Sequence, residues 1–278
     1  MVSIRLMTGL DIPGVMRLKA QAGWNQREAD LLRMLDLEPD GCFVAELDGR
    51  VAGTTTTCVF GPVAWVAMVL VNESLRRRGI ATALMNHALA YLEGRGVQTV
   101  RLDATPLGQP VYERLGFIAE YRLARYQGSP TVSAPVPGVE PARPEDLEEV
   151  ARLDREVTGT DRRKLLVRLF EERPEEMRVV RNGARLQGFI TARPGSEAIQ
   201  VGPCQATAEA GPLLLADACR RYAGQSIFLD IPLGNTAGGR LAEEQGLTVQ
   251  RHLLRMYRGV PIHERVDMLW ASSGPEKG

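Results

Sequence analysis

Two parts of the chain carry the same order of sequence signals, and this internal repeat limits the folds that the chain can adopt. Leu102–Gln109 is echoed by Leu229–Asn235, and each segment leads into a helical stretch. These stretches end on similar turns, Leu-Gly-Phe at 115–117 and Gln-Gly-Leu at 245–247. Because a repeat of this length corresponds to a whole folding unit, the sequence predicts two copies of one fold.

A proline-rich stretch separates the two copies. Prolines and small residues at 129–138 offer little to pack and are typical of a linker. We therefore expect one domain at 1–128, the linker at 129–138, a second domain at 139–271 and a flexible tail at 272–278. The chain has 278 residues, which is enough for two domains of ordinary size.

Short apolar strands alternate with helical patterns in the first copy. The dipeptide Asp48-Gly49 lies between two apolar runs and is a strong signal for a two-residue hairpin turn. The order that we read is strand, two helices, three strands, helix, strand, helix and strand. Such an alternation indicates an α/β protein.

A basic turn at 75–82 joins a strand to a helix. The run 65–71 before it is apolar and β-branched, and 81–93 after it carries apolar residues at helical spacing. The first N–H groups of a helix have no partner within the helix, and the helix dipole adds positive charge there. With three arginines around these groups, the turn favours a polyanion such as a pyrophosphate.

The pattern of this turn narrows the choice of ligand. No GxxxxGK[ST] loop occurs in the chain, and no GxGxxG follows a strand. Arg76, Gly79 and Ala81 form the pattern Arg-x-x-Gly-x-Ala, which resembles motif A of the GCN5-related N-acetyltransferases (GNATs). In that family the loop amides wrap the pyrophosphate of acetyl-coenzyme A (acetyl-CoA).

The resemblance covers nearly the whole chain. It implies an α/β (α+β) protein of two tandem GNAT-like domains, each with a central mixed, mostly antiparallel sheet flanked by helices. The second copy resembles the degenerate domain of the YitH-like group. In place of the basic turn, 201–212 has no arginine, gains Glu209, which would repel phosphate, and contains prolines that lack donor N–H groups. We therefore expect one half to bind the cofactor.

The resemblance also implies which residues meet acetyl-CoA. The strand before the turn would offer backbone groups to pantetheine and the acetyl carbonyl, although an ordinary buried strand is the alternative. Gln109 stands where the family often has an asparagine that contacts pantetheine, and a rigid spacer loop is the alternative there. The expected cofactor-binding residues are Met68, Val69, Leu70, Val71, Arg76, Arg77, Arg78, Gly79, Ile80, Ala81, Thr82, Gln109 and Tyr112.

Tyr112 and Asp103 are the candidate catalytic residues. Tyr112 matches the family's tyrosine before Leu-Gly-Phe, and a phenol with an ordinary pKa of about 10 is protonated at neutral pH, so it can donate to a leaving thiolate. The alternative is that Tyr112 only packs. Asp103 can accept the proton of the amine, but Asp230 repeats it in the second copy, which favours a structural role.

Trp24, Asn25, Gln26 and Asp30 lie between the first two helices, on the side that receives the acceptor in this family. A tryptophan beside two amides and a carboxylate suits a cationic amine. The alternative is that Trp24 packs on the core and that Asn25 caps a helix.

Composition excludes several other classes of protein. The 34 basic and 34 acidic residues balance, which gives no case for nucleic acid or membrane binding. The four cysteines form no CxxC pair, so we expect no metal site. The chain has no apolar run of membrane-spanning length and no signal peptide at its start, so we expect a cytoplasmic monomer or homodimer.

These observations lead to one principal hypothesis and two alternatives. The principal one is an acetyl-CoA-dependent N-acetyltransferase that transfers the acetyl group directly to a primary amine of a small molecule or peptide. The first alternative is a non-catalytic acyl-CoA-binding sensor or scaffold. The second is that both halves bind the cofactor.

Overall fold

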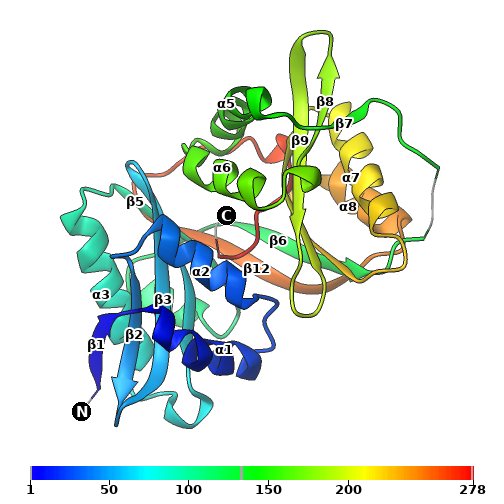
Figure 1. Ribbon diagram of the computed structural model, residues 1–278. Coiled ribbons are helices and arrows are strands. Elements are labelled where there is room, and N and C mark those ends of the chain that lie inside the picture. Colours follow the sequence, from blue (N-terminus) through cyan, green and yellow to red (C-terminus); the bar gives the residue numbers. More distant parts are fainter. Residues whose placement is uncertain (1, 132–133, 277) are drawn as a thin grey trace. The chain divides into compact units, whose positions relative to one another are not determined.

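The computed structural model describes residues 2–131, 134–276 and 278, and its helices and strands are shown in Figure 1. The chain forms two compact units. Unit 1 comprises Met1–Ala119, Met256–Pro261 and Pro275–Gly278, and unit 2 comprises Glu120–Arg255 and Ile262–Gly274. Each unit thus draws on both sequence copies, whereas the sequence predicted a boundary at 129–138. Residues 132 and 133 of that expected linker lie outside the described residues.

Unit 1 is built on a sheet in the order β1-β2-β3-β4-β5. All neighbours are antiparallel except β4 and β5, which are parallel. The strands are β1 (Ser3–Leu6), β2 (Cys42–Leu47), β3 (Arg50–Phe60), β4 (Val63–Val71) and β5 (Thr99–Ala104). The helices are α1 (Ile12–Gln21), α2 (Glu28–Leu37), α3 (Ile80–Gly94) and α4 (Gln109–Arg114).

Helices cover both faces of this sheet (Figure 1). Ile80, Leu84 and Ala88 of α3 pack against Phe43 and Ala45 of β2, as the helical spacing after the basic turn predicted. On the other face, α1 approaches β3 so closely that a Cβ atom on Gly14 would lie 2.8 Å from Cγ2 of Val51. The sheet of unit 1 is therefore buried between α3 and the pair α1 and α2.

Unit 2 repeats this plan with the strand order β12-β6-β11-β10-β9-β8-β7. Its strands are β6 (Ile118–Gly128), β7 (Val139–Pro141), β8 (Arg178–Asn182), β9 (Arg185–Arg193), β10 (Ile199–Ala206), β11 (Ile227–Pro232), β12 (Thr248–Gly259) and β13 (Leu269–Ala271), which pairs with β10. Its helices are α5 (Leu147–Thr158), α6 (Arg163–Glu172), α7 (Ala210–Arg221) and α8 (Thr236–Glu244). Two mixed, helix-flanked sheets confirm the predicted fold class.

The two copies exchange a strand. β6 belongs to the first copy by sequence, yet it lies in unit 2 and pairs antiparallel with β11 over Leu123–Gly128. Its counterpart β12 ends in unit 1, where it neighbours β5. There the hydroxyl group of Thr99 donates to the carbonyl oxygen of Val260 at 2.6 Å. Each unit is therefore completed by a strand from the other copy.

Asp230 lies in a buried ion pair that belongs to the architecture of unit 2. Its carboxylate accepts two hydrogen bonds from the guanidinium group of Arg125 on β6, at 2.8 and 2.7 Å, and one from the amide of Gln200 at 3.1 Å. Both members of the pair are at most 2% exposed. The aspartate that repeats Asp103 in the second copy thus links β11 to β6 through a buried, hydrogen-bonded ion pair.

Candidate active site

β4 and β5 separate from one another part of the way along unit 1. Their parallel pairing joins Val63–Trp65 to Thr99–Arg101 and goes no further. β4 nevertheless continues to Val71, and β5 continues to Ala104. The two strands thus form a V that is closed at Trp65 and opens toward the end of β4. Backbone groups along the open edge of β4 are the kind that a ligand can pair with.

A bulge in β4 lies inside this V. The pairing register between β3 and β4 shifts between Thr54 and Thr56, and Met68 adopts a left-handed backbone conformation with φ of 51°. A residue with a side chain rarely adopts this conformation, because its Cβ atom crowds the backbone. Strained backbone of this kind concentrates at binding sites, and a bulge re-aims the groups beside it. The predicted segment 68–71 therefore lies at the open edge of the sheet.

The basic turn follows directly from the open end of β4. Arg77 and Gly79 both adopt left-handed backbone conformations, with φ of 62° and 79°, and Gly79 is the N-cap of α3. Among the residues that the structure describes, no side chain makes a capping hydrogen bond at this end of α3. Arg76 is paired with Glu73 at 3.3 Å and remains 39% exposed, and Arg78 is also exposed. The first-turn N–H groups and the arginines are thus available to an anion at the mouth of the V.

Tyr112 is buried in α4 of unit 1. Its ring lies 6.0 Å from the ring of Phe117, and a Cβ atom on Gly108 would lie 2.9 Å from ring atom Cε2. Burial raises the pKa of the phenol well above its usual value, because the charged form loses its hydration. The phenol is therefore protonated at neutral pH, as a proton donor must be.

Asp103 and Gln109, the other two residues predicted near the thioester, are less buried than Tyr112. Asp103 is partly buried close to the end of β5. The side-chain amide of Gln109 donates to the carboxylate of Glu113 at 2.7 Å on an exposed part of α4. All three residues lie in unit 1, and in the chain they follow Arg101, where the pairing of β5 with β4 ends.

Of the four residues predicted to contact the acceptor substrate, Asp30 differs from the other three. Asp30 is committed to α2, since it accepts from the N–H group of Arg27 at 2.9 Å and from Arg33 at 2.7 Å. Arg27 is the N-cap of α2, so the alternative of Asn25 as a cap does not hold. Asn25 and Gln26 are buried, and Trp24 is partly exposed.

Sequence reasoning missed Glu276, which is 3% exposed and accepts a hydrogen bond from the amide of Gln26 at 3.0 Å. We expected a flexible tail over 272–278, but Ser272, Ser273, Gly274 and Gly278 are buried as well. Gln26 and Glu276 are separated by 250 residues, and nothing in the local pattern of either segment signals this contact.

The second copy has the same V, but its own chain fills it. β10 pairs with β11 only over Ile199–Val201, and β13 then pairs with β10 through Cys204 and Gln205. The indole of Trp270 on β13 is 1% exposed, packs directly on Gly211 in the first turn of α7, and donates to the carbonyl oxygen of Ala206 at 3.1 Å. The space that corresponds to the V of unit 1 is thus occupied by β13.

Three further features of the second copy also differ from the first copy. The hydroxyl oxygen of Thr207 accepts from the N–H group of Ala210 at 3.3 Å, while the N-cap residue Glu209 itself makes no side-chain capping bond. Glu209 adds a carboxylate whose pKa is lowered by hydrogen bonds from its own backbone and from Thr207. Gly238 or Gly239 stands near the position that corresponds to Tyr112, and a Cβ atom on Gly239 would lie 2.9 Å from the hydroxyl oxygen of Tyr126.

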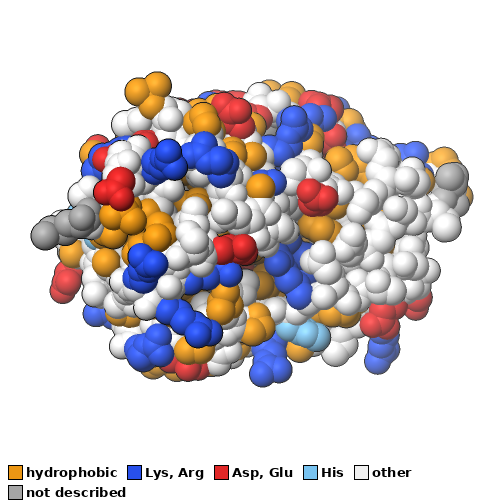
Figure 2. Space-filling model, turned by 90° about the horizontal axis from the view of Figure 1, so that it is seen from below, with side chains coloured by type: hydrophobic (Ala, Val, Ile, Leu, Met, Phe, Trp, Pro, Cys, Tyr) orange, Lys and Arg blue, Asp and Glu red, His pale blue; other side chains and the backbone are white. Residues whose placement is uncertain are grey.

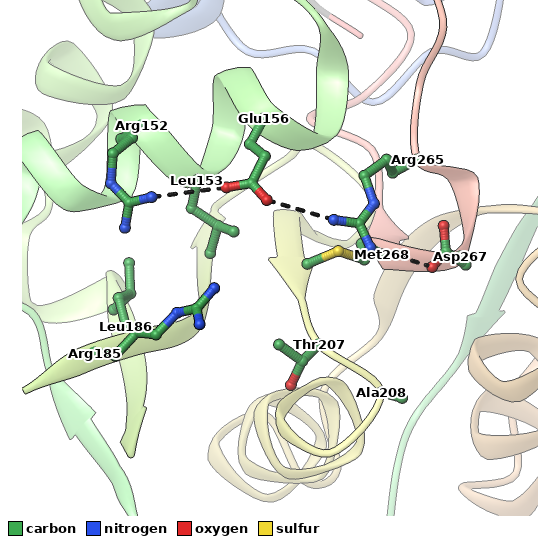
Figure 3. Close-up of a pocket in the computed structure, with 10 residues that line it drawn as sticks. All are labelled: Arg152, Leu153, Glu156, Arg185, Leu186, Thr207, Ala208, Arg265, Asp267 and Met268. Carbon is green, nitrogen blue, oxygen red and sulfur yellow. Dashed lines mark hydrogen bonds and ion pairs between the residues drawn. The ribbon is translucent and has the colours of Figure 1, made fainter. Parts of the chain in front are cut away.

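A pocket of about 310 Å³ lies in unit 2, between α5, β9 and the segment before α7 (Figure 3). Glu156 lies between two arginines there, 3.7 Å from Arg152 and 3.4 Å from Arg265, and Asp267 lies 3.9 Å from Arg265. These ion pairs neutralise much of the positive charge that Arg152, Arg185 and Arg265 bring to the pocket. The pocket therefore differs from the exposed, triply basic turn before α3 in unit 1.

Other classes of site find little support. Among the described residues, no group of three or more histidine, cysteine and acidic side chains is placed to hold a metal ion. No described helix is both long and apolar enough to cross a bilayer. Figure 2 shows acidic and apolar side chains among the basic ones on the face that it presents.

Comparison with known proteins identifies the class of this chain. The acetyltransferase (GNAT) family matches residues 15–117, and an acetyltransferase (GNAT) domain family matches residues 150–271. The chain belongs to the GNAT acetyltransferases and carries two GNAT domains in tandem. It is an acyltransferase, which confirms the predicted family, repeat and enzyme class. Members of the family act on amine acceptors.

Individual proteins that resemble the chain are also named as acyltransferases or acetyltransferases. The chain is 23% identical over 240 residues to holothin acyltransferase of Pseudoalteromonas sp. (strain SANK 73390), which spans 85% of this chain and 81% of that protein. It is 24% identical over 164 residues to the uncharacterised N-acetyltransferase YitH of Bacillus subtilis, or 57% of each. A crystal structure of a candidate acetyltransferase from Pyrococcus horikoshii superimposes with a TM-score of 0.86 at 25% identity, over 100% of this chain and 96% of that one.

Proposed function

We propose that the chain transfers an acetyl group from acetyl-CoA to a primary amine, at a single site in unit 1. The observation that carries this proposal is the opening of β4 from β5, which leads straight to an uncapped, triply basic helix start. The opening suits an extended chain such as pantetheine, and the helix start suits its pyrophosphate. The strained backbone at Met68 adds support, because it alters how β4 presents its backbone groups within the opening.

Each predicted residue then has a part in binding. The backbone of Met68–Val71 would pair with pantetheine and polarise the acetyl carbonyl, as preorganised N–H donors do. The N–H groups from Gly79 to Thr82, with Arg76, Arg77 and Arg78, would hold the phosphates. Bound acetyl-CoA supplies the activated acyl group.

The chain's own side chains would move the protons. As the amine nitrogen bonds to the carbonyl carbon and the carbon–sulfur bond breaks, Tyr112 would give its proton to the departing thiolate. The amine gives up a proton in the same reaction, and Asp103 is our candidate to accept it, directly or through water. Burial and the raised pKa of Tyr112 support its role as the acid.

Unit 2 would not bind acetyl-CoA. β13 pairs with the edge that pantetheine would need, and Trp270 covers the first turn of α7. The hydroxyl oxygen of Thr207 accepts from the N–H group of Ala210 in that turn, and Glu209 places a negative charge beside it. We therefore expect one molecule of acetyl-CoA per chain, and two per chain would favour the alternative in which both halves bind.

Removing two arginines tests the cofactor site. In the Arg76→Ala, Arg78→Ala double variant we expect the Kd for acetyl-CoA, measured by calorimetry, to rise about tenfold or more, because charge-assisted contacts to phosphate are lost. Both side chains are exposed, so the melting temperature should hardly change. The matched control is Arg17→Ala with Arg50→Ala, which removes two other exposed arginines from unit 1. Unchanged affinity in the first variant, or an equal loss in the control, would reject the site.

A further inference from the structure

The pocket of unit 2 has the size and the floor of a small-molecule site (Figure 3). Its volume of about 310 Å³ lies at the lower end of the range for such pockets, roughly 300–1,000 Å³. Its apolar side chains are Leu153 on α5, Leu186 on β9 and Met268, each at most 7% exposed. All three belong to one hydrophobic cluster of the core, so packing holds this apolar floor in place.

Three arginines stand around the floor, and each comes from a different segment of unit 2. Arg152 lies on α5, Arg185 begins β9, and Arg265 directly precedes the short helix Val266–Met268. Their guanidinium groups point from different sides toward the middle of the pocket (Figure 3). A guanidinium group has five N–H donors and can bind a carboxylate through two of them at once. This convergence suits an anionic ligand.

Glu156 holds two of these arginines only loosely. Its carboxylate lies 3.7 Å from Arg152 and 3.4 Å from Arg265, and all three side chains are exposed. In the same unit, the buried pair of Asp154 and Arg162 is joined by hydrogen bonds of 2.6 and 3.0 Å. Exposed ion pairs contribute little to stability, and these are long as well. A ligand can therefore take over N–H donors of Arg152 and Arg265 at little cost.

Arg185 brings a positive charge that is not engaged. Within the part of the chain that the structure describes, its side chain has no ion-pair or hydrogen-bond partner. The lining of the pocket holds three guanidinium groups and the carboxylates of Glu156 and Asp267. Three positive charges less two negative ones leave one positive charge, which a singly charged anion balances.

Two further carboxylates adjoin the lining and limit the charge of the ligand. Glu149 lies 4.0 Å from Arg152 and accepts a hydrogen bond from Arg181 at 3.1 Å. Glu209 accepts a hydrogen bond from the lining residue Thr207. Both groups would repel a doubly charged phosphate more strongly than a singly charged carboxylate. The charges around the pocket therefore favour a monocarboxylate.

We propose that this pocket is a second ligand site of the protein and binds a small organic monocarboxylate. The three arginines hold the carboxylate group in place of the loose contacts of Glu156. The apolar part of the ligand lies on the floor formed by the two leucines and Met268. The site belongs to unit 2 alone, and its occupancy does not depend on the acetyl transfer proposed for unit 1.

Methyl NMR of the full chain tests this site, because Met268 lies in its floor. The chain is labelled with carbon-13 at the methionine methyl groups, and the Met268 signal is assigned by its absence from the Met268→Leu variant. The probes are hexanoate and benzoate, and their neutral counterparts are hexanamide and benzamide. At constant pH and ionic strength, we expect at least one carboxylate to shift the Met268 signal saturably. It should bind about tenfold more tightly than its amide.

Variants of the arginines connect the shift to the proposed contacts. Arg185→Ala should weaken carboxylate binding about tenfold and leave amide binding unchanged, because only the charged contact is lost. Arg152→Ala should act in the same direction, and it replaces Arg185→Ala if that variant does not fold. The matched control is Arg50→Ala, which removes the exposed arginine that begins β3 in unit 1 and should bind as the wild type does.

Inorganic phosphate at the same ionic strength should shift the Met268 signal only at concentrations about tenfold higher than the preferred carboxylate. Four results would overturn the proposal. They are no shift with either carboxylate, equal affinity for acid and amide, carboxylate binding that survives both arginine substitutions, and phosphate binding as tight as carboxylate binding. None of them bears on the acetyl-CoA site, which calorimetry measures separately.

Discussion

Replacing Tyr112 with phenylalanine should lower kcat by about 100-fold or more while the Kd for acetyl-CoA changes little. General acid catalysis by a positioned side chain contributes roughly 10²–10⁴-fold, and phenylalanine removes only the hydroxyl group. The ring keeps its packing against Phe117 and Gly108, so stability should be retained. The measurement is coenzyme A release with an amine panel, after acetyl-CoA binding has been confirmed by calorimetry.

The pH profile adds a second readout for Tyr112. Burial raises the pKa of its phenol, so the group keeps its proton up to and beyond pH 10. An alkaline loss of kcat between pH 7 and 9 would therefore have to come from another group.

Tyr91→Phe is the control for the Tyr112→Phe substitution, because it removes a phenol of unit 1 that donates to Glu38 at 2.8 Å. A Tyr112→Phe enzyme with wild-type kcat would exclude the phenol as the acid.

Replacing Trp270 with alanine should destabilise the protein by about 3–5 kcal/mol, the usual cost of removing a buried tryptophan. The indole fills the space above Gly211 and satisfies the carbonyl oxygen of Ala206, so its loss leaves both a cavity and an unpaired acceptor. Denaturant unfolding followed by circular dichroism measures the change. A loss below 1 kcal/mol would show that β13 is not held in place through Trp270.

The same variant tests whether Trp270 alone excludes acetyl-CoA from unit 2. We expect calorimetry to give one molecule of acetyl-CoA per chain before and after the substitution. The hydroxyl oxygen of Thr207 still accepts from the N–H group of Ala210 in the variant, and Glu209 still repels phosphate. A second binding event in Trp270→Ala would assign the exclusion to the indole alone.

Local signals predicted the elements around the V of unit 1 well. The hairpin at Asp48-Gly49 forms with both residues in left-handed conformations, at φ of 50° and 72°, which is what a two-residue turn of this type requires. The basic turn leads into α3 at Ile80, close to the predicted helix start. These features depend on residues that are adjacent in the chain, so the sequence alone carries them.

Long-range pairing lay beyond such signals. β6 and β12 are counterparts in the repeat, so their patterns suit either sheet and do not show which strand completes which unit. The contacts of Trp65 with Pro275 and of Gln26 with Glu276 join residues 210 and 250 positions apart. Asp30 carries the residue type of an acceptor site, but its position in the first turn of α2 assigns it to the helix instead.

The strand exchange gives the second copy a structural role that does not depend on a basic turn. The sheet of unit 1 ends on Met256–Gly259, which the second copy encodes, and the sheet of unit 2 needs β6 from the first. A gene cut within the linker would leave both products with an unfinished sheet edge. Substitutions in the last strand of the second copy would therefore act on the sheet of unit 1, whatever the second copy itself binds.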